Sequence, residues 1–122
     1  MNINIKTTNI TLKPETEAYL TKKLEGIKKF IDLEDENVFA QVELGKTTNH
    51  HKSGNIFLAE INLRAGKKTY RVVSEKEDLH AAIDDMKDEL LAEVKTYHEK
   101  QRTIHRKGAA EIKNIVKGVE NE

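Results

Sequence analysis

The most regular hydrophobic pattern in the chain lies between Ser74 and Gln101. Six apolar residues recur there at intervals of three or four, a spacing that places them on one stripe of an α-helix: Leu79, Ile83, Met86, Leu90, Val94 and Tyr97. Ser74 and Glu77 stand in capping-box order, and Asp78 offers an alternative start one turn later. The pattern predicts a long amphipathic helix whose apolar stripe needs a partner.

A second helix is predicted after Pro14, the only proline of the chain. Proline fits the first turn of a helix, and Glu15 and Glu17 suit the positive end of the helix dipole. The apolar stripe of this helix would consist of Leu20, Leu24, Ile27 and Ile31. This helix is therefore also apolar on one side only, and its lysines lie on the flanks and outer face.

Four segments alternate apolar and polar residues with the period of a β-strand. They cover residues 2–8, 38–44, 56–64 and 68–73. Residues 45–55 contain two glycines and no apolar side chain, so we expect a long exposed loop there. Ala65 and Gly66 leave room only for a hairpin between the last two strands. The sheet should have one buried and one wet face.

The order of these elements predicts an α+β fold of the type β-α-β-β-β-α, a four-stranded sheet with two helices packed on one face. From the first helix onward it is the order of a double-stranded RNA binding domain. We expect residues 1–101 to form this domain and residues 102–122 to be a basic C-terminal extension, partly helical or disordered. Gly108 interrupts the apolar rhythm of the extension, which still has an amphipathic spacing at Ile112, Ile115, Val116 and Val119.

The composition limits the function classes. A chain of 122 residues with 37% hydrophobic content supports one domain. The absence of cysteine excludes disulfides, thiolate zinc sites and cysteine nucleophiles. No apolar run approaches the roughly 18 residues of a membrane span, and the N-terminus alternates instead of resembling a signal peptide. We therefore expect a cytoplasmic protein without a membrane partner.

The charge is balanced in total but segregated along the chain. Lys plus Arg and Asp plus Glu both number 21. Residues 75–93 hold eight acidic side chains against two lysines, whereas residues 95–117 hold seven basic side chains against two glutamates. One predicted helix would thus change sign along its length.

Histidines and carboxylates are the candidates for catalytic or metal chemistry. His50 with His51, and His98 with His105, lack the third and fourth ligands of a zinc site. The carboxylates Asp84, Asp85, Asp88 and Glu89 are close enough in sequence for magnesium or acid–base work, but a solvated helix face explains them more simply. We expect no enzyme activity, no metal, no cofactor and no small-molecule substrate.

Three stretches resemble the ribosome hibernation factor family, also called ribosome-associated translation inhibitors. They are NINIKTTNITLKPETEAYLTKKLEGIKKF, the strand-rich middle, and VSEKEDLHAAIDDMKDEL, and the resemblance covers roughly residues 1–101. Its most specific piece is Asp78-Leu79-His80-Ala81-Ala82-Ile83-Asp84, which matches the family's Asp-Met-Tyr-Ala-Ala-Ile-Asp at five of seven positions. The chain lacks room for the C-terminal dimerisation domain of the long members and so resembles the short form.

This resemblance implies binding to the small ribosomal subunit and its rRNA, in the channel that holds messenger and transfer RNA, so that translation stops while the idle ribosome is preserved. Lys23 corresponds to a basic family position. Glu89, Ala92 and Glu93 stand where the family has Lys, Arg and Gln, so we expect the contacts to shift toward the C-terminal end. The candidate rRNA-binding residues are Lys22, Lys23, Lys29, Lys95, Lys100, Arg102, Arg106 and Lys107.

Two other functions remain open. One is a generic structured-RNA-binding module, and the other is a protein-interaction regulator that acts through the acidic helix face. Comigration with ribosomes is expected for the family function and not for a generic RNA-binding module. A steep salt dependence is expected for both of these RNA-binding functions and not for the protein-interaction regulator. We expect the chain to be a monomer when it is off the ribosome.

Overall fold

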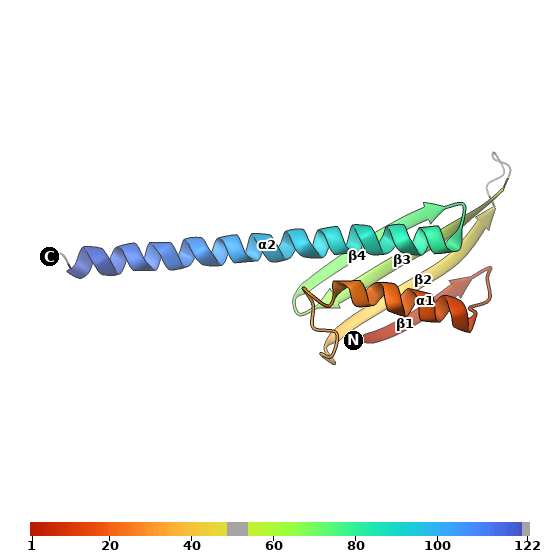
Figure 1. Ribbon diagram of the computed structural model, residues 1–122, viewed down its shortest axis with the longest axis horizontal. Coiled ribbons are helices and arrows are strands. Elements are labelled where there is room, and N and C mark those ends of the chain that lie inside the picture. The colour runs from red at the N-terminus through yellow and green to blue at the C-terminus, as the bar shows by residue number, and fades with distance from the viewer. Residues whose placement is uncertain (49–53, 121–122) are drawn as a thin grey trace.

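The computed structural model describes residues 1–48 and 54–120, and the side chains of residues 1–47 and 54–112. Its elements are β1 (Asn2–Thr8), α1 (Pro14–Leu24), the 3-10 turn η1 (Glu25–Ile27), β2 (Val38–Thr48), β3 (Asn55–Ala65), β4 (Lys68–Lys76) and α2 (Leu79–Glu120). The four strands form one sheet in the order β1-β2-β3-β4, with β1 parallel to β2 and the other pairs antiparallel. Both helices lie on the same face of the sheet, which confirms the predicted α+β fold (Figure 1).

The core lies between the two apolar helix stripes and one face of the sheet. Ile83, Met86, Leu90 and Val94 of α2 are almost fully buried, as are Leu20, Leu24 and Ile27 from the first helical segment. The strands contribute alternate residues because successive side chains of a strand point to opposite faces. Phe39 and Val73 point to the opposite face and are nearly half exposed, so the outer face of the sheet is exposed to solvent, as predicted.

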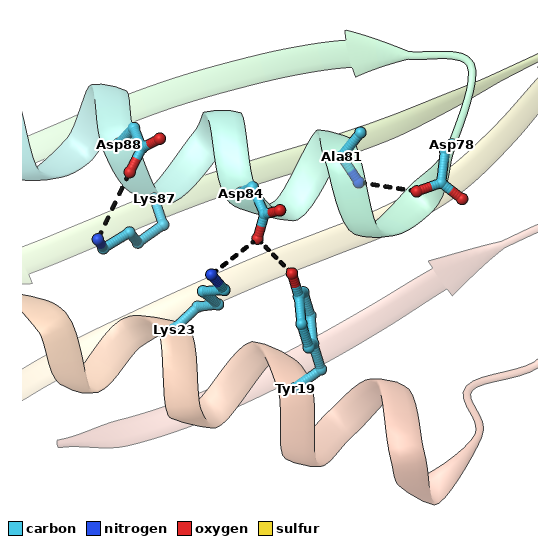
Figure 2. Close-up of polar contacts among 7 residues, drawn as sticks. All are labelled: Tyr19, Lys23, Asp78, Ala81, Asp84, Lys87 and Asp88. Atoms are coloured by element: carbon cyan, nitrogen blue, oxygen red, sulfur yellow. Dashed lines mark hydrogen bonds and ion pairs between the residues drawn. The ribbon is translucent and has the colours of Figure 1, made fainter.

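The start of α2 is set by Asp78. Its carboxylate accepts a hydrogen bond from the backbone N–H of Ala81 at 3.0 Å, which satisfies one of the unpaired donors of the first turn (Figure 2). The predicted capping-box start at Ser74 is wrong, because β4 continues to Lys76 and Ser74 pairs with Ala59 in the sheet. The Ser74 hydroxyl instead donates to Asp85 at 2.7 Å, tying the strand to the helix.

The exposed loop predicted over residues 45–55 is wrong at both of its ends. β2 extends to Thr48 and β3 begins at Asn55, and their register continues from Gly45 opposite Leu58 to Thr48 opposite Asn55. A polar composition does not prevent pairing, because the sheet is held by backbone groups that every residue except proline supplies. The remaining residues 49–53, which include His50 and His51, lie outside the described part of the chain.

Two glycines explain local details of the sheet. Gly66 has a φ of +62°, a conformation that glycine adopts without strain, and it opens the two-residue turn between β3 and β4. Gly45 is buried beside β1, where an added Cβ would lie only 3.3 Å from the carbonyl oxygen of Thr8. A larger residue there would push β1 away from β2.

The helix α2 is 42 residues long, much longer than the sheet that it covers. Tyr97 is its last residue packed against the core, and beyond it the helix projects away from the rest of the molecule (Figure 1). The helix passes through Gly108 without a break. In the described residues no helix is both long and apolar enough to cross a membrane. The division of the chain at residue 101 stays a prediction.

Candidate nucleic-acid interface

The two helices are joined at their seam by three side chains. Asp84 of α2 accepts a hydrogen bond from the Tyr19 hydroxyl at 2.5 Å and pairs with the Lys23 ammonium at 3.2 Å (Figure 2). The Tyr19 ring also stacks on His80, with ring centroids 4.3 Å apart. Tyr19 and Lys23 are four residues apart, so they lie on the same side of α1 and reach one carboxylate. The contact fixes how α1 sits beside α2.

This contact changes the protonation equilibria of its members. The hydrogen bond from Tyr19, reinforced by Lys23, lowers the pKa of Asp84 below its ordinary value of 3.8. The hydrogen bond to Asp84 raises the pKa of Lys23 above 10.5 and that of Tyr19 above 10.0. At neutral pH the pair is therefore charged, and a phosphate that contacts Lys23 must share it with Asp84.

The other two candidate cations of the first helical region face water. Lys22 lies in the last turn of α1, and Lys29 follows the 3-10 turn. Both are exposed, and neither forms an ion pair with the described residues. They are available to an external anion without breaking an internal contact.

A first group of α2 cations lies on the flank of the helix that faces α1. His98 identifies this flank at the end of the domain, because its ring centroid lies 5.4 Å from that of Phe30. Lys95 precedes His98 by three residues, and Arg102 and Arg106 follow it by four and eight, so helical spacing places all three on this flank. Arg102 and Arg106 line one shallow hollow together with His98, Gln101 and His105.

A second group lies on the opposite flank of α2. Lys100 and Lys107 are seven residues apart and therefore share a face, which is turned away from that of Arg102. Lys100 lines a groove between α2 and β4 together with Lys68, Tyr70 and Tyr97. The eight candidate residues thus lie in three groups: the α1 surface, the α1-facing flank and the β4-facing flank. They do not form one continuous face.

Lys68 is a cation that the sequence analysis did not include. Its ammonium lies 5.5 Å from the ring centre of Tyr70 and 5.0 Å from that of Tyr97, within the range of cation–π attraction. Together with Lys100 it gives the β4-facing groove a basic and aromatic lining. The sequence contained a signal for it, since Lys67 and Lys68 directly follow the hairpin glycine and Lys68 begins an edge strand.

The acidic section of α2 divides into two parts. Asp84 and Asp85 are bound to neighbouring elements through Tyr19, Lys23 and Ser74. Asp88, Glu89 and Glu93 are exposed. Across residues 1–48 and 54–112 no three His, Asp or Glu side chains are grouped so that they would hold a metal ion.

Comparisons with known proteins agree with this fold. Residues 3–102 match the model of a family described as sigma 54 modulation protein / S30EA ribosomal protein. The chain is similar to the crystal structure of the Thermus thermophilus Protein Y N-terminal domain, with 28% identity, a TM-score of 0.66, and 80% of this chain and 99% of that one covered. No curated protein sequence matches it.

A second solved structure shares the fold at lower identity. It is a ribosomal subunit interface protein from Coxiella burnetii, 16% identical, with a TM-score of 0.61 over 80% of this chain and 97% of that one. The match to the family model ends at residue 102, just after α2 has left the domain. Most of the projecting helix therefore lies outside the matched region.

Proposed function

This chain belongs to the sigma 54 modulation protein / S30EA ribosomal protein family, and we propose that it binds the small ribosomal subunit and inhibits translation while idle ribosomes are preserved. The observation that carries the proposal is the family match across residues 3–102, supported by the likeness to the Protein Y N-terminal domain. The binding place would be the channel for messenger and transfer RNA. The protein would act in the cytoplasm, under stress that leaves ribosomes idle.

The contacts to rRNA would come from the exposed cations on and beyond the two helices. Lys22, Lys29, Lys95, Lys100, Arg102, Arg106 and Lys107 are exposed, and Lys23 is partly exposed beside Asp84. Each phosphate that a cation neutralises releases counterions, so binding gains free energy from every contact and weakens as salt rises. Arg102 and Arg106 should contribute most, because a planar guanidinium donates two parallel hydrogen bonds to phosphate.

The acidic residues of α2 determine where these contacts lie. Asp88, Glu89 and Glu93 are exposed on the part of α2 that covers the sheet, and they repel phosphate. The free part of the helix carries Arg102, Arg106 and Lys107. We therefore place the main rRNA contacts on the projecting part of α2, with Lys22 and Lys29 as a second contact area.

The experiment that tests this function is sedimentation of the full chain with purified small and large ribosomal subunits. We expect comigration with the small subunit, loss of comigration at high salt, and competition by messenger RNA. In a cell-free translation assay the protein should reduce synthesis without degrading ribosomes. No comigration at low salt would contradict the proposal.

Matched variants identify the surface. Arg102→Ala with Arg106→Ala should weaken subunit binding and flatten its salt dependence by roughly 0.7 to 0.9 in log K per log salt for each phosphate that is no longer neutralised. The control is Lys6→Ala with Arg64→Ala, which removes two exposed cations from the outer face of the sheet. Equal effects of the two double variants would mean that net charge, and not the helix surface, drives binding.

The alternative functions predict different outcomes of the same experiments. A generic RNA-binding module, which the element order also fits, would bind a short RNA duplex as tightly as the small subunit. A protein-interaction regulator that uses Asp88, Glu89 and Glu93 would retain its partner after Arg102 and Arg106 are replaced, and would lose it when the acidic residues are replaced.

A further inference from the structure

The projecting part of α2 carries an apolar stripe that touches nothing in the described structure. Ile104 and Ile112 are 53% and 65% exposed, the two most exposed large hydrophobic residues that the structure describes. Gly108 lies midway between them, and an added Cβ there would meet no atom within 4 Å. The three residues follow Tyr97 at intervals of seven, four and four, so they extend the stripe that is buried against the sheet.

The apolar stripe of the projecting helix is not packed against any described residue. In proteins, most helical stability comes from packing of an apolar face. Between His98 and Glu120 the described contacts of α2 with other elements are limited to its first residues, near Phe30 and the groove beside β4. The stripe therefore needs a partner that is apolar along its centre and matches the charges beside it.

We propose that this partner is the projecting helix of a second copy of the chain, packed antiparallel with Gly108 against the partner's Gly108. Ile104 then meets the partner's Ile112, and the same contact occurs again on the other side of the two-fold axis, as an isologous interface requires. Glycine at the crossing point lets the two backbones approach closely.

In this arrangement the charged residues beside the stripe of one copy lie opposite residues of opposite charge in the other copy. Lys107 and Glu111 lie on the same flank of the stripe, four residues apart, and both are exposed. In an antiparallel pair of helices, like flanks face each other, so Lys107 lies opposite the partner's Glu111 and Glu111 opposite the partner's Lys107. The other flank presents His105 and Ala109, which bring no like charges together. A parallel pair would not place Lys107 against Glu111.

The length of the free helix also fits. The segment from His98 to the end of α2 at Glu120 has its midpoint at Ala109, one residue from the proposed crossing. Antiparallel pairing about this point covers the whole free segment and ends where each sheet begins, so the two domains lie at opposite ends. Arg102 and Arg106 lie well around the helix from the stripe and stay exposed, so pairing leaves these two arginines open to rRNA, whereas Lys107 faces the partner's Glu111.

This inference goes beyond the proposed function and departs from the expectation of a monomer. It is tested by sedimentation velocity of the full chain over a range of concentrations, without ribosomes. We expect a monomer–dimer equilibrium with no larger species. A chain that stays monomeric at every accessible concentration, or that forms open-ended polymers, would overturn the proposal.

Charge exchange tests the antiparallel register. Lys107→Glu and Glu111→Lys, each alone, place like charges together in both symmetric pairs and should weaken the dimer by roughly tenfold or more. The two substitutions in one chain should restore it, and an equimolar mixture of the two single variants should form a heterodimer. Failure of both rescues would overturn the register.

Two further variants separate the interface from general effects. Ile104→Ser with Ile112→Ser should abolish the dimer while the thermal unfolding of the domain stays unchanged, because neither isoleucine belongs to the core. Arg106→Glu, on the far side of the helix, should leave the dimer affinity within about twofold of the parent chain, a tolerance set by the weakness of screened surface charges. A dimer that survives the serine substitutions would place the interface elsewhere.

Discussion

The two halves of α2 have the same hydrophobic spacing but different surroundings. From Leu79 to Tyr97 the stripe is buried against the sheet, and from His98 onward the spacing continues with Ile104 and Ile112 exposed. The charges differ as well: the packed half is acidic and the free half is basic. Hydrophobic periodicity therefore predicts that a segment is helical and which side is apolar, but it does not tell whether a partner is present.

The change of sign follows the boundary between the halves. Over the domain, Asp84 and Asp85 hold neighbouring elements, so acidic residues there have structural uses. Beyond the domain the helix has no sheet to hold, and its side chains are available to external partners. We interpret the packed half as the part that positions the helix and the free half as the part that binds external partners.

The largest expected effect is that of Leu90→Ala in the packed half. Leu90 is fully buried at the centre of the stripe, and its truncation should lower the free energy of unfolding by about 2 to 5 kcal/mol. The matched change in the free half is Ile104→Ala, which should alter the unfolding of dilute, monomeric protein by less than about 0.5 kcal/mol. Denaturant titration measures both. Equal effects would mean that the two halves are not different in packing.

The second prediction removes the excess of negative charge from the packed half. Glu89→Lys with Glu93→Gln removes two exposed carboxylates near the proposed rRNA surface and adds one cation. Affinity for the small ribosomal subunit should rise by several fold, and the salt dependence should steepen by roughly one phosphate contact. Filter binding over a series of salt concentrations measures both quantities. Unchanged affinity would place the packed half away from the rRNA.

The third and smallest effect concerns the contact between the helices. Asp84→Asn should lower stability at neutral pH, but much less than Leu90→Ala, because the Asp84 and Lys23 side chains are each more than a third exposed. Thermal unfolding of the parent chain and the variant across pH measures the difference.

The pH window of this difference follows from the three shifts. The pKa of Asp84 is lowered, so its contribution is complete above 3.8 and is lost as the pH falls through the lower folded value. The pKa values of Tyr19 and Lys23 are raised, so their contributions are complete below 10.0 and 10.5 and are lost as the pH rises further. The stability difference should therefore be flat between these limits and shrink on both sides. A steady slope through neutral pH would assign it to other groups.

Most of the fold could be predicted from the sequence. The stripes of both helices, the alternation of the four strands and the single wet face of the sheet all follow from burial, which repeats with the period of the element. The errors were local. Gly45 to Thr48 and Asn55 are polar yet belong to strands, since strand pairing with a neighbour depends on backbone groups that composition does not reveal.

The candidate site was less predictable. Helical spacing alone separates Lys100 from Arg102, but only the structure shows which flank faces α1 and which faces β4. Likewise, only the folded structure brings Tyr19 and Lys23 into contact with Asp84, which is more than sixty residues away in sequence. Lys68 was missed because its neighbours, Tyr97 and Lys100, come from the other end of the chain.

The central claim is that the free half of α2 carries the main contacts to the ribosome. It is tested most directly by the salt dependence of small-subunit binding for the full chain and for a chain truncated after Lys100. The control is full-length Ile104→Ser with Ile112→Ser, which keeps every cation but cannot pair through the apolar stripe. We predict that truncation weakens binding and lowers the slope by roughly 0.7 to 0.9 for each phosphate that is no longer neutralised, while the control binds like the parent chain. Equal affinity of the truncated and full chains at both low and high salt would contradict the claim. The contacts would then lie among the candidates that the truncated chain retains, which are Lys22, Lys23, Lys29, Lys95 and Lys100.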